Sequence, residues 1–140
     1  MYARVPSRVY RDDVIFICKI RGKEVIEKEY GLLKNLDIVL TEERRKHILE
    51  RRGPKDYALI MKYLKSVLID YDELYDDYRG NKTGVCYIKY LKDNQFCAIM
   101  VSLSLEKESR ANSNITGIIF SDDSYKRYVK NRKLIDAKTQ

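Results

Sequence analysis

The stretch that decides the fold reads VCYIKYLKDNQFCAIMVSLSL, residues 85–105. Its two apolar runs, residues 85–91 and 96–105, flank the polar tetrapeptide KDNQ at residues 92–95. Runs rich in β-branched and aromatic residues favour strands, and a short polar connection between them favours an antiparallel hairpin. A third run of this kind follows at residues 114–120. The second half of the chain is therefore predicted to form an antiparallel sheet.

Two helices are expected before this sheet. Thr41 precedes two glutamates, which is typical of an N-cap followed by first-turn acids, and the helix should run to about Arg52. Gly53 and Pro54 then supply a terminating glycine and a proline that cannot continue the helix. A second helix is predicted over residues 54–70. Its apolar stripe, which would bury against a partner, consists of Ile60, Leu64, Val67 and Leu68.

The remaining segments complete an α+β architecture. Residues 13–20 read as a buried strand, residues 23–34 as either a helix or a hairpin, and residues 37–40 as a short apolar segment. A basic helix is expected over residues 124–134, after a cap at Ser121. The predicted fold thus has an N-terminal strand and helices that precede an antiparallel sheet of about four strands, followed by a C-terminal helix.

The length of 140 residues suits one domain. Within it we expect a basic arm at residues 1–11, an N-terminal extension at 12–36, a core at 37–120, and a basic C-terminal helix and tail at 121–140. No apolar run reaches the roughly 18–20 residues that a membrane span needs, and the first residues lack a secretory pattern. The expectation is a cytoplasmic protein without a membrane partner.

Charge and composition narrow the function. The 28 Lys and Arg residues exceed the 21 Asp and Glu residues, for a net charge of +7, which favours polyanionic partners such as RNA. Three cysteines without CxxC spacing and a single histidine argue against a zinc site, so no metal or cofactor is expected. The sequence also lacks a Gly-rich phosphate loop, a nucleophile elbow and an HExxH motif. Nucleotide hydrolysis, serine hydrolysis and zinc proteolysis therefore have no support.

Strand alternation sorts the predicted sheet into two faces. One face is consistently apolar and should bury the helices: it carries Cys86, Ile88, Tyr90, Cys97, Ile99, Val101, Leu103, Leu105, Ile115 and Ile119. The other collects hydroxyl, amide and amine groups: Tyr87, Lys89, Ser102, Ser104, Asn114 and Thr116. The second face is interpreted either as a binding surface or as an ordinary solvated sheet face.

The only histidine lies on the first predicted helix. Arg44, His47 and Arg51 stand at i, i+3 and i+7, so they share one side of the helix and place an imidazole between two guanidinium groups. Such a row can bind an anion, and the histidine can exchange a proton there. The alternative is an exposed histidine on a basic helix.

These residues also carry a resemblance. Residues 38–52 read I-V-L-T-x-x-R-x-x-H-I-L-x-R-R, with x for free positions. This pattern resembles the opening motif of phage and mobile-element nucleases of the barnase-EndoU-colicin-RelE group. In that group the motif helix precedes a second helix, a Y-x-K strand (here residues 87–89), a middle apolar strand and a closing strand (here NSNIT, residues 112–116). The resemblance spans about residues 38–120.

The resemblance implies a metal-independent ribonuclease that cleaves RNA, including tRNA, through a 2′,3′-cyclic phosphate. It makes His47 the general base or acid, with Lys89 and Arg51 holding the phosphate and Tyr87 and Thr116 orienting the backbone. Because the chain has one histidine, a two-histidine scheme is excluded, and the leaving-group acid would be Lys89, Tyr87 or water. Substrate contacts would extend to Arg44, Ser102, Ser104 and Asn114. A nuclease of this kind could act as a toxin with a cognate immunity or antitoxin protein.

Two other readings stay open. A non-catalytic nucleic-acid-binding module would use the C-terminal basic stretch, where Lys126 and Arg127 lie between Tyr125 and Tyr128. The alternative is that this helix has no binding role and has a solvated basic face with the tyrosines packed inward. A protein-inhibitor module would instead use the acidic run at residues 70–77 against a basic partner. The alternative is that this run has no binding role and is a solvated helix end.

Overall fold

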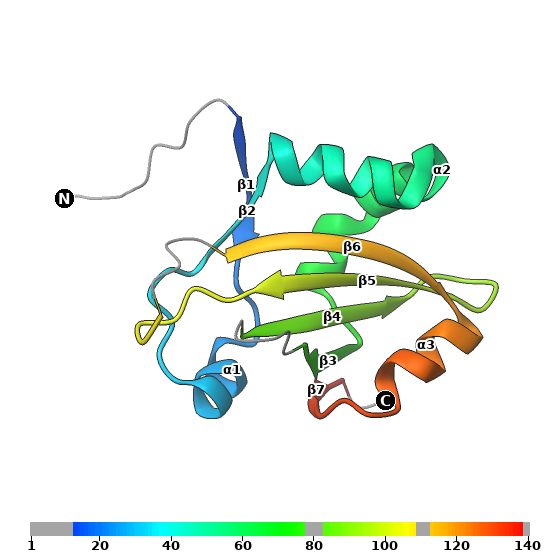
Figure 1. Cartoon of the computed structure of the whole chain (residues 1–140). Coiled ribbons are helices and arrows are strands. Elements are labelled where there is room, and N and C mark those ends of the chain that lie inside the picture. Colours follow the sequence, from blue (N-terminus) through cyan, green and yellow to red (C-terminus); the bar gives the residue numbers. More distant parts are fainter. Residues whose placement is uncertain (1–12, 78–82, 109–112, 139–140) are drawn as a thin grey trace.

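The computed structural model describes residues 13–77, 83–108 and 113–138, and over these the chain forms seven strands and three helices (Figure 1). Both element types are present, so the predicted α+β class is confirmed. Among the described helices, none has the length and apolar character of a membrane span. The basic arm expected at residues 1–11 lies outside the described residues. In chain order the elements are β1 (Val14–Lys19), α1 (Lys23–Tyr30), β2 (Asp37–Thr41), α2 (Glu42–Ile69), β3 (Glu73–Asp76), β4 (Gly84–Tyr90), β5 (Gln95–Ser102), β6 (Ser113–Ser121), α3 (Asp122–Val129) and β7 (Leu134–Ala137).

The strands form one sheet in the order β1-β2-β6-β5-β4-β3-β7. The five strands from β6 to β7 pair antiparallel, and β1 and β2 form a second antiparallel pair. The two blocks are joined by a short parallel pairing, in which Ile38 lies opposite Ser113 and Val39 opposite Asn114. The predicted antiparallel pairing is therefore confirmed, and the sheet is larger than the four strands expected.

Two of the additional strands, β3 and β7, lie at or beyond the ends of predicted helices. The acidic run was interpreted either as a surface for a basic partner or as a solvated helix end, but it contains β3, which pairs with β4 and β7 and buries Leu74 and Tyr75. The C-terminal helix was expected to reach residue 134, but α3 ends at Val129 and β7 follows. Each of these strands has four residues, which is too short for period-two alternation to stand out from the surrounding charges.

Helix α2 consists of two helical segments that meet at Gly53. The backbone there has φ 85° and ψ 164°, a conformation outside the helical region, and Pro54 begins the second segment. At the start of α2, the Thr41 hydroxyl oxygen accepts a hydrogen bond of 3.1 Å from the Arg44 backbone N–H. The predicted cap and the predicted break between two helices are both confirmed.

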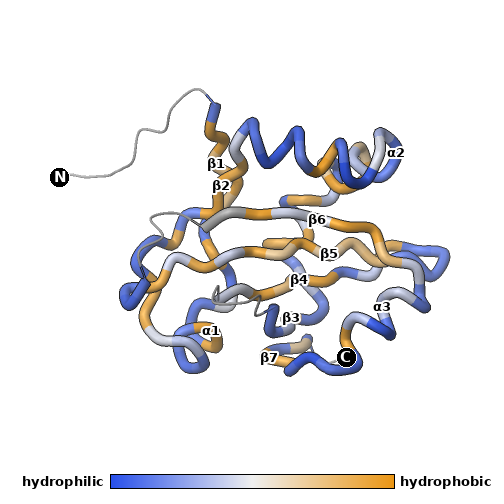
Figure 2. The backbone as a smooth tube through the Cα atoms, in the orientation of Figure 1, coloured by the Kyte–Doolittle hydropathy of each residue, from blue (hydrophilic) through white to orange (hydrophobic). Residues whose placement is uncertain are grey.

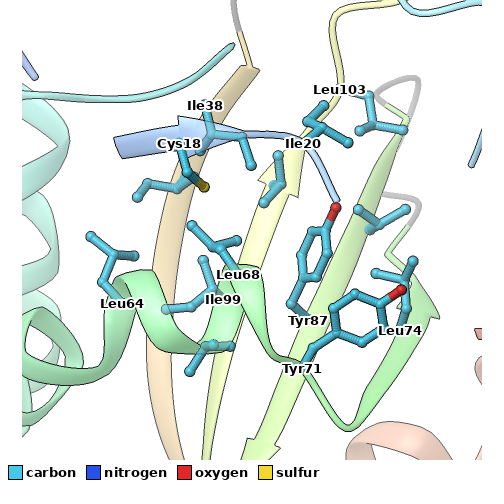
Figure 3. Packing of buried hydrophobic residues seen from close by; sticks show 14 of the residues in the cluster. Cys18, Ile20, Ile38, Leu64, Leu68, Tyr71, Leu74, Tyr87, Ile99 and Leu103 are labelled. Carbon is cyan, nitrogen blue, oxygen red and sulfur yellow. The ribbon is translucent and has the colours of Figure 1, made fainter. Parts of the chain in front are cut away.

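The second segment of α2 covers one face of the sheet. Its predicted apolar stripe is buried in full against β4, β5 and β6 (Figure 3). The packing is closest at Gly117 on β6, where a Cβ atom would lie 2.8 Å from a methyl carbon of Ile60 and 3.1 Å from one of Ile99. Only a residue without a side chain allows the helix to approach β6 this closely.

Helix α3 covers part of the opposite face. A second apolar cluster lies there, and Tyr125, Tyr128 and Val129 of α3 pack against it. Its buried members are Tyr75, Cys86, Ile88, Ala98, Met100 and Phe120. The sheet is therefore buried on both sides over its central strands, rather than wet on one side.

Burial on both sides explains an error in the predicted face assignment. In the observed register Tyr87 lies opposite Ile99 and Cys86 opposite Met100. Tyr87 and Lys89 therefore share the α2 face, and Cys86 and Ile88 share the α3 face, the reverse of the prediction for β4. The assignments for β5 and β6 hold, because Met100 lies opposite Thr116 and Val101 opposite Ile115. When a strand has apolar side chains on both sides, its sequence does not show which side packs against which helix.

The N-terminal segments differ from expectation in one respect. Residues 23–30 form α1, which decides between the two options for that stretch. Residues 14–19 do form a strand, and Cys18 and Ile20 are buried in the main core, but the predicted burial is wrong for the first part of the strand. β1 lies at the edge of the sheet, and Ile15 and Phe16 are 50% and 48% exposed.

Candidate nucleic-acid interface

The first segment of α2 carries the arginine–histidine row. Ile48 is 1% exposed and fixes the inner side of this segment in the main core. Since side chains three and four residues apart share a side, Arg44, His47 and Arg51 lie together beside that buried stripe. The structure leaves Arg44 and His47 half-buried and Arg51 exposed. Figure 2 shows the backbone of this segment as mostly hydrophilic.

The other two arginines of this segment have structural partners. Arg45 forms an ion pair with Glu42, and the Arg52 Nε donates a 3.0 Å hydrogen bond to the Gly117 backbone carbonyl. That carbonyl belongs to the part of β6 beyond its pairing with β2. Arg52 therefore connects the helix to the sheet, and Arg45 forms its ion pair within the first turns of the same helix.

The row itself is not occupied by internal contacts. Within the described residues, the side chains of His47 and Arg51 form no hydrogen bond or ion pair, and the Arg44 Nε is buried without a hydrogen-bond partner. The whole of α2 carries eight Lys and Arg residues against four Asp and Glu residues. This side of the molecule therefore presents unneutralised positive charge with donors available to an anion.

The structure separates Tyr87 and Lys89 from this row. Tyr87 is fully buried, and its hydroxyl donates a 2.7 Å hydrogen bond to the Arg21 carbonyl, as its position in the core of Figure 3 shows. Burial raises the pKa of this hydroxyl well above its ordinary value. Lys89 donates to the Asp70 carboxylate at 3.1 Å and to the Asp70 carbonyl at 2.9 Å. Hydrogen bonds from Lys138 and Lys89 hold the pKa of the Asp70 carboxyl below its ordinary range.

Ser102 of β5 and Thr116 of β6, two of the predicted polar residues, lie on the α3 face. Ser102 pairs with residue Asn114, and Thr116 pairs with Met100, so the positions of Ser102 and Thr116 share a side of adjacent strands. Ser104 follows the end of β5 and is fully buried. In the described structure, no hydrogen bond links His47 to this group. The structure thus brings Arg44, His47 and Arg51 together, and places Ser102 and Thr116 separately on the α3 face of the sheet.

The basic residues of α3 are exposed but engaged with their own helix. Lys126 pairs with Asp122 at 2.9 Å, and Arg127 donates to the Ser124 hydroxyl at 3.2 Å. Tyr125 and Tyr128 pack inward on the second apolar cluster. The tyrosines of this helix therefore pack inward, while Lys126 and Arg127 lie on its exposed side.

The carboxylates of the acidic run accept hydrogen bonds inside the molecule. Tyrosine hydroxyls donate to its carboxylates: Tyr125 to Glu73, Tyr30 to Asp76 and Tyr128 to Asp77. Asp77 is only 5% exposed and also pairs with Arg132. Sequence reasoning missed these tyrosine–carboxylate contacts. The one available signal was the surplus of twelve tyrosines in a chain without tryptophan.

Metal ligands do not gather in the described structure: it contains no group of three or more His, Cys, Asp and Glu side chains placed to hold an ion. The three cysteines are buried and free, and burial raises the pKa of the Cys97 thiol to about 12. Comparison with protein-family models, curated proteins and solved structures gave no match. The arrangement on α2 is therefore the feature from which a function can be argued.

Proposed function

We propose that the protein binds RNA through the row of Arg44, His47 and Arg51 on α2. The observation that carries this proposal is the combination of position and availability: the three side chains share one side of a helix and have no internal acidic partner among the described residues. Guanidinium groups bind phosphate oxygens with two parallel hydrogen bonds, and a helix of fixed pitch spaces them along a backbone.

The charge distribution supports a polyanion at this location. The ion pairs of the acidic run involve Asp70 and Asp77, which pair with lysines and with Arg132, whereas α2 retains an excess of positive charge. Release of counterions from the phosphates would then supply much of the binding free energy. The resemblance of residues 38–52 to nuclease motifs points to RNA, and we place the protein in the cytoplasm of a cell that hosts a phage or mobile element.

A barnase-EndoU-colicin-RelE arrangement is part of this proposal. Two helical segments precede the antiparallel strands β4, β5 and β6, which matches the order of parts that the resemblance implies. On this view β1, α1, β3 and β7 are additions around a nuclease-like core. An immunity or antitoxin protein would be the corresponding protein partner.

Metal-independent RNA cleavage is a second candidate, favoured by the free imidazole of His47. In this scheme His47 accepts the proton of a ribose 2′-hydroxyl, the 2′-oxygen forms a bond to phosphorus, and the bond from phosphorus to the 5′-oxygen breaks. Arg44 and Arg51 stabilise the charge on the phosphate. Because Tyr87 is buried and Lys89 is held by Asp70, water is the proton donor to the leaving oxygen.

The binding proposal is tested with fluorescein-labelled single-stranded RNA and an R44Q/R51Q double variant. The expected result is weaker binding, with the slope of log Kd against log salt concentration reduced by about 1.4, since two phosphate contacts are lost. The matched control is K126Q/R127Q, which removes the same charge from α3 and should leave most of the affinity. Equal losses in the two variants would mean that net charge, not the row, binds RNA.

The same proteins then test cleavage. Wild-type protein and H47A are incubated with total RNA and tRNA in excess EDTA, and product ends are analysed for cyclic phosphate. Cleavage that leaves cyclic ends and disappears in H47A supports the second candidate. Binding without cleavage by the wild type removes that candidate and leaves the RNA-binding proposal in place.

A further inference from the structure

A cavity of about 270 Å³ opens where β7, β3, β4, β5 and α3 meet, away from the arginine–histidine row. It has both aromatic and acidic walls, and neither RNA binding nor the core explains this combination. The lining residues that matter are Asp72, Glu73, Tyr90, Phe96, Tyr125 and Lys138.

The aromatic side of the cavity is a corner of packed rings. The Tyr90 and Phe96 rings meet edge to face, with centroids 5.4 Å apart and planes at 70°. Phe96 in turn stacks on Tyr125 at 4.0 Å with planes at 7°. Tyr90 is 48% exposed although it is a large aromatic residue. Such rings attract a cation through the negative potential of their faces.

The acidic side consists of two carboxylates, Asp72 and Glu73. The Asp72 Oδ2 accepts a 2.8 Å hydrogen bond from the Tyr90 backbone N–H, and the Glu73 Oε1 accepts one from the Tyr125 hydroxyl. Glu73 also has a side-chain hydrogen bond with Tyr75, and neither carboxylate forms an ion pair with a described Lys or Arg side chain. Two negative charges therefore line the cavity, held in place by the residues that form its aromatic corner.

The lysine at the rim does not cancel these charges. Lys138 forms an ion pair with Asp70, and Lys89 pairs with the same carboxylate at 3.1 Å. Together, the five charged groups comprise three carboxylates and two ammonium groups. The region thus keeps a net negative charge on a protein that is otherwise basic.

We propose that this cavity binds a guanidinium group, as in an arginine side chain. A guanidinium is planar, stacks on aromatic rings, and has donors in a fork that suits carboxylate oxygens. A lysine ammonium lacks the planar group and the fork. The proposal does not rest on RNA binding, because it uses no residue of the α2 row.

The test is a titration followed by amide chemical shifts, with Nα-acetyl-arginine methylamide as the probe and the citrulline analogue as its neutral match. We expect shift changes centred on β3, Tyr90 and α3 with the arginine compound and none with citrulline. The D72N variant, whose amide oxygen can keep the Tyr90 contact, should weaken binding about tenfold or more. E106Q, which removes an exposed charge on a distant loop, should bind like the wild type.

The outcomes separate cleanly. Three results would each overturn the proposal. These are equal binding of the citrulline compound, unchanged binding of the arginine compound by both the D72N and the Y90A variants, and shift changes elsewhere in the protein. A second arm compares the arginine compound with a short arginine-containing peptide. Tighter binding of the peptide identifies a protein partner as the source of the guanidinium, and equal binding identifies a small molecule.

Discussion

Tyr128 illustrates how single residues stabilise this molecule. Its ring packs between α3 and the sheet, its hydroxyl donates to the Asp77 carboxylate, and the Arg132 guanidinium lies 4.1 Å above the ring. Because Asp77 is almost completely buried, its charge depends on these donors. When a buried carboxylate loses a hydrogen-bond donor, the folded state is destabilised, because no water replaces that donor.

We predict that Y128F lowers the free energy of unfolding by about 1–3 kcal/mol, because it leaves a buried acceptor with one donor fewer. Y30F is the matched control. It removes the equivalent hydrogen bond to Asp76, which is only half-buried and can be hydrated instead, so its effect should stay near 0.5–1 kcal/mol, roughly a normal net hydrogen bond. Urea denaturation of both variants measures the difference, and equal effects would contradict this account.

At this scale the sequence predicts what helix geometry dictates. The shared side of Arg44, His47 and Arg51 follows from spacing alone, because a helix places such residues together wherever it packs. The sheet face that carries Tyr87 and Lys89 cannot be predicted from spacing. Both sides of β4 are apolar, so the pattern fits either orientation of the strand. Which tyrosine meets which acid depends on contacts between residues about 46–52 positions apart.

Among the elements, the break in α2 controls how the basic segment stands relative to the covering segment. Gly53 adopts positive φ with ψ near 164°, a region accessible almost only to glycine. No atom would obstruct a Cβ there, so the backbone alone sets the cost of substitution.

We predict that G53A and G53N each lower the free energy of unfolding by roughly 1–3 kcal/mol. Asparagine relieves strain at left-handed helical positions, where ψ lies near 45°, but it offers no relief at this ψ. Similar losses in thermal or urea unfolding are therefore expected for both variants. If G53N were clearly more stable than G53A, the backbone conformation assigned to Gly53 would be wrong.

The boundaries of α2 were predictable because caps, glycine and proline act locally. Strands β3 and β7 were not, because each is short and is formed by its pairing with another segment. Local propensity at residues 70–77 is dominated by acids, which strands disfavour, and the tertiary contacts of Leu74 and Tyr75 override it.

For the whole molecule, the sheet with helices on both faces places Cys97 at its centre. Burial raises the pKa of this thiol to about 12 from an ordinary 9.0, so the folded protein keeps it protonated where the unfolded chain would ionise it. Its contribution to stability is complete below pH 9 and is lost progressively as the pH rises through 12.

We therefore predict that unfolding becomes easier above pH 9, and that C97A loses less stability than the wild type over the same range. At pH 10 the difference between the two profiles should have narrowed by about 1.4 kcal/mol, one unit of pKa. Urea denaturation at pH 7, 9 and 10 provides the measurement. Parallel profiles would show that Cys97 ionises equally in both states.

The class and the antiparallel pairing of the sheet were predictable from alternating runs and a short loop. The parallel junction of β2 with β6 was not, because its two residue pairs join segments more than 70 residues apart and have no sequence pattern of their own. Coverage of both sheet faces was also missed, since it depends on how the chain returns after β6.

The edge strand β1 has a consequence for association between molecules. Its outer row of backbone N–H and C=O groups has no strand beside it in the described sheet, and Ile15 and Phe16 expose apolar surface on it. Natural proteins usually protect such an edge with charged residues or proline, because it offers a template for strand addition. We expect molecules to associate through this edge at high concentration. I15K or F16K would oppose this association without altering the core.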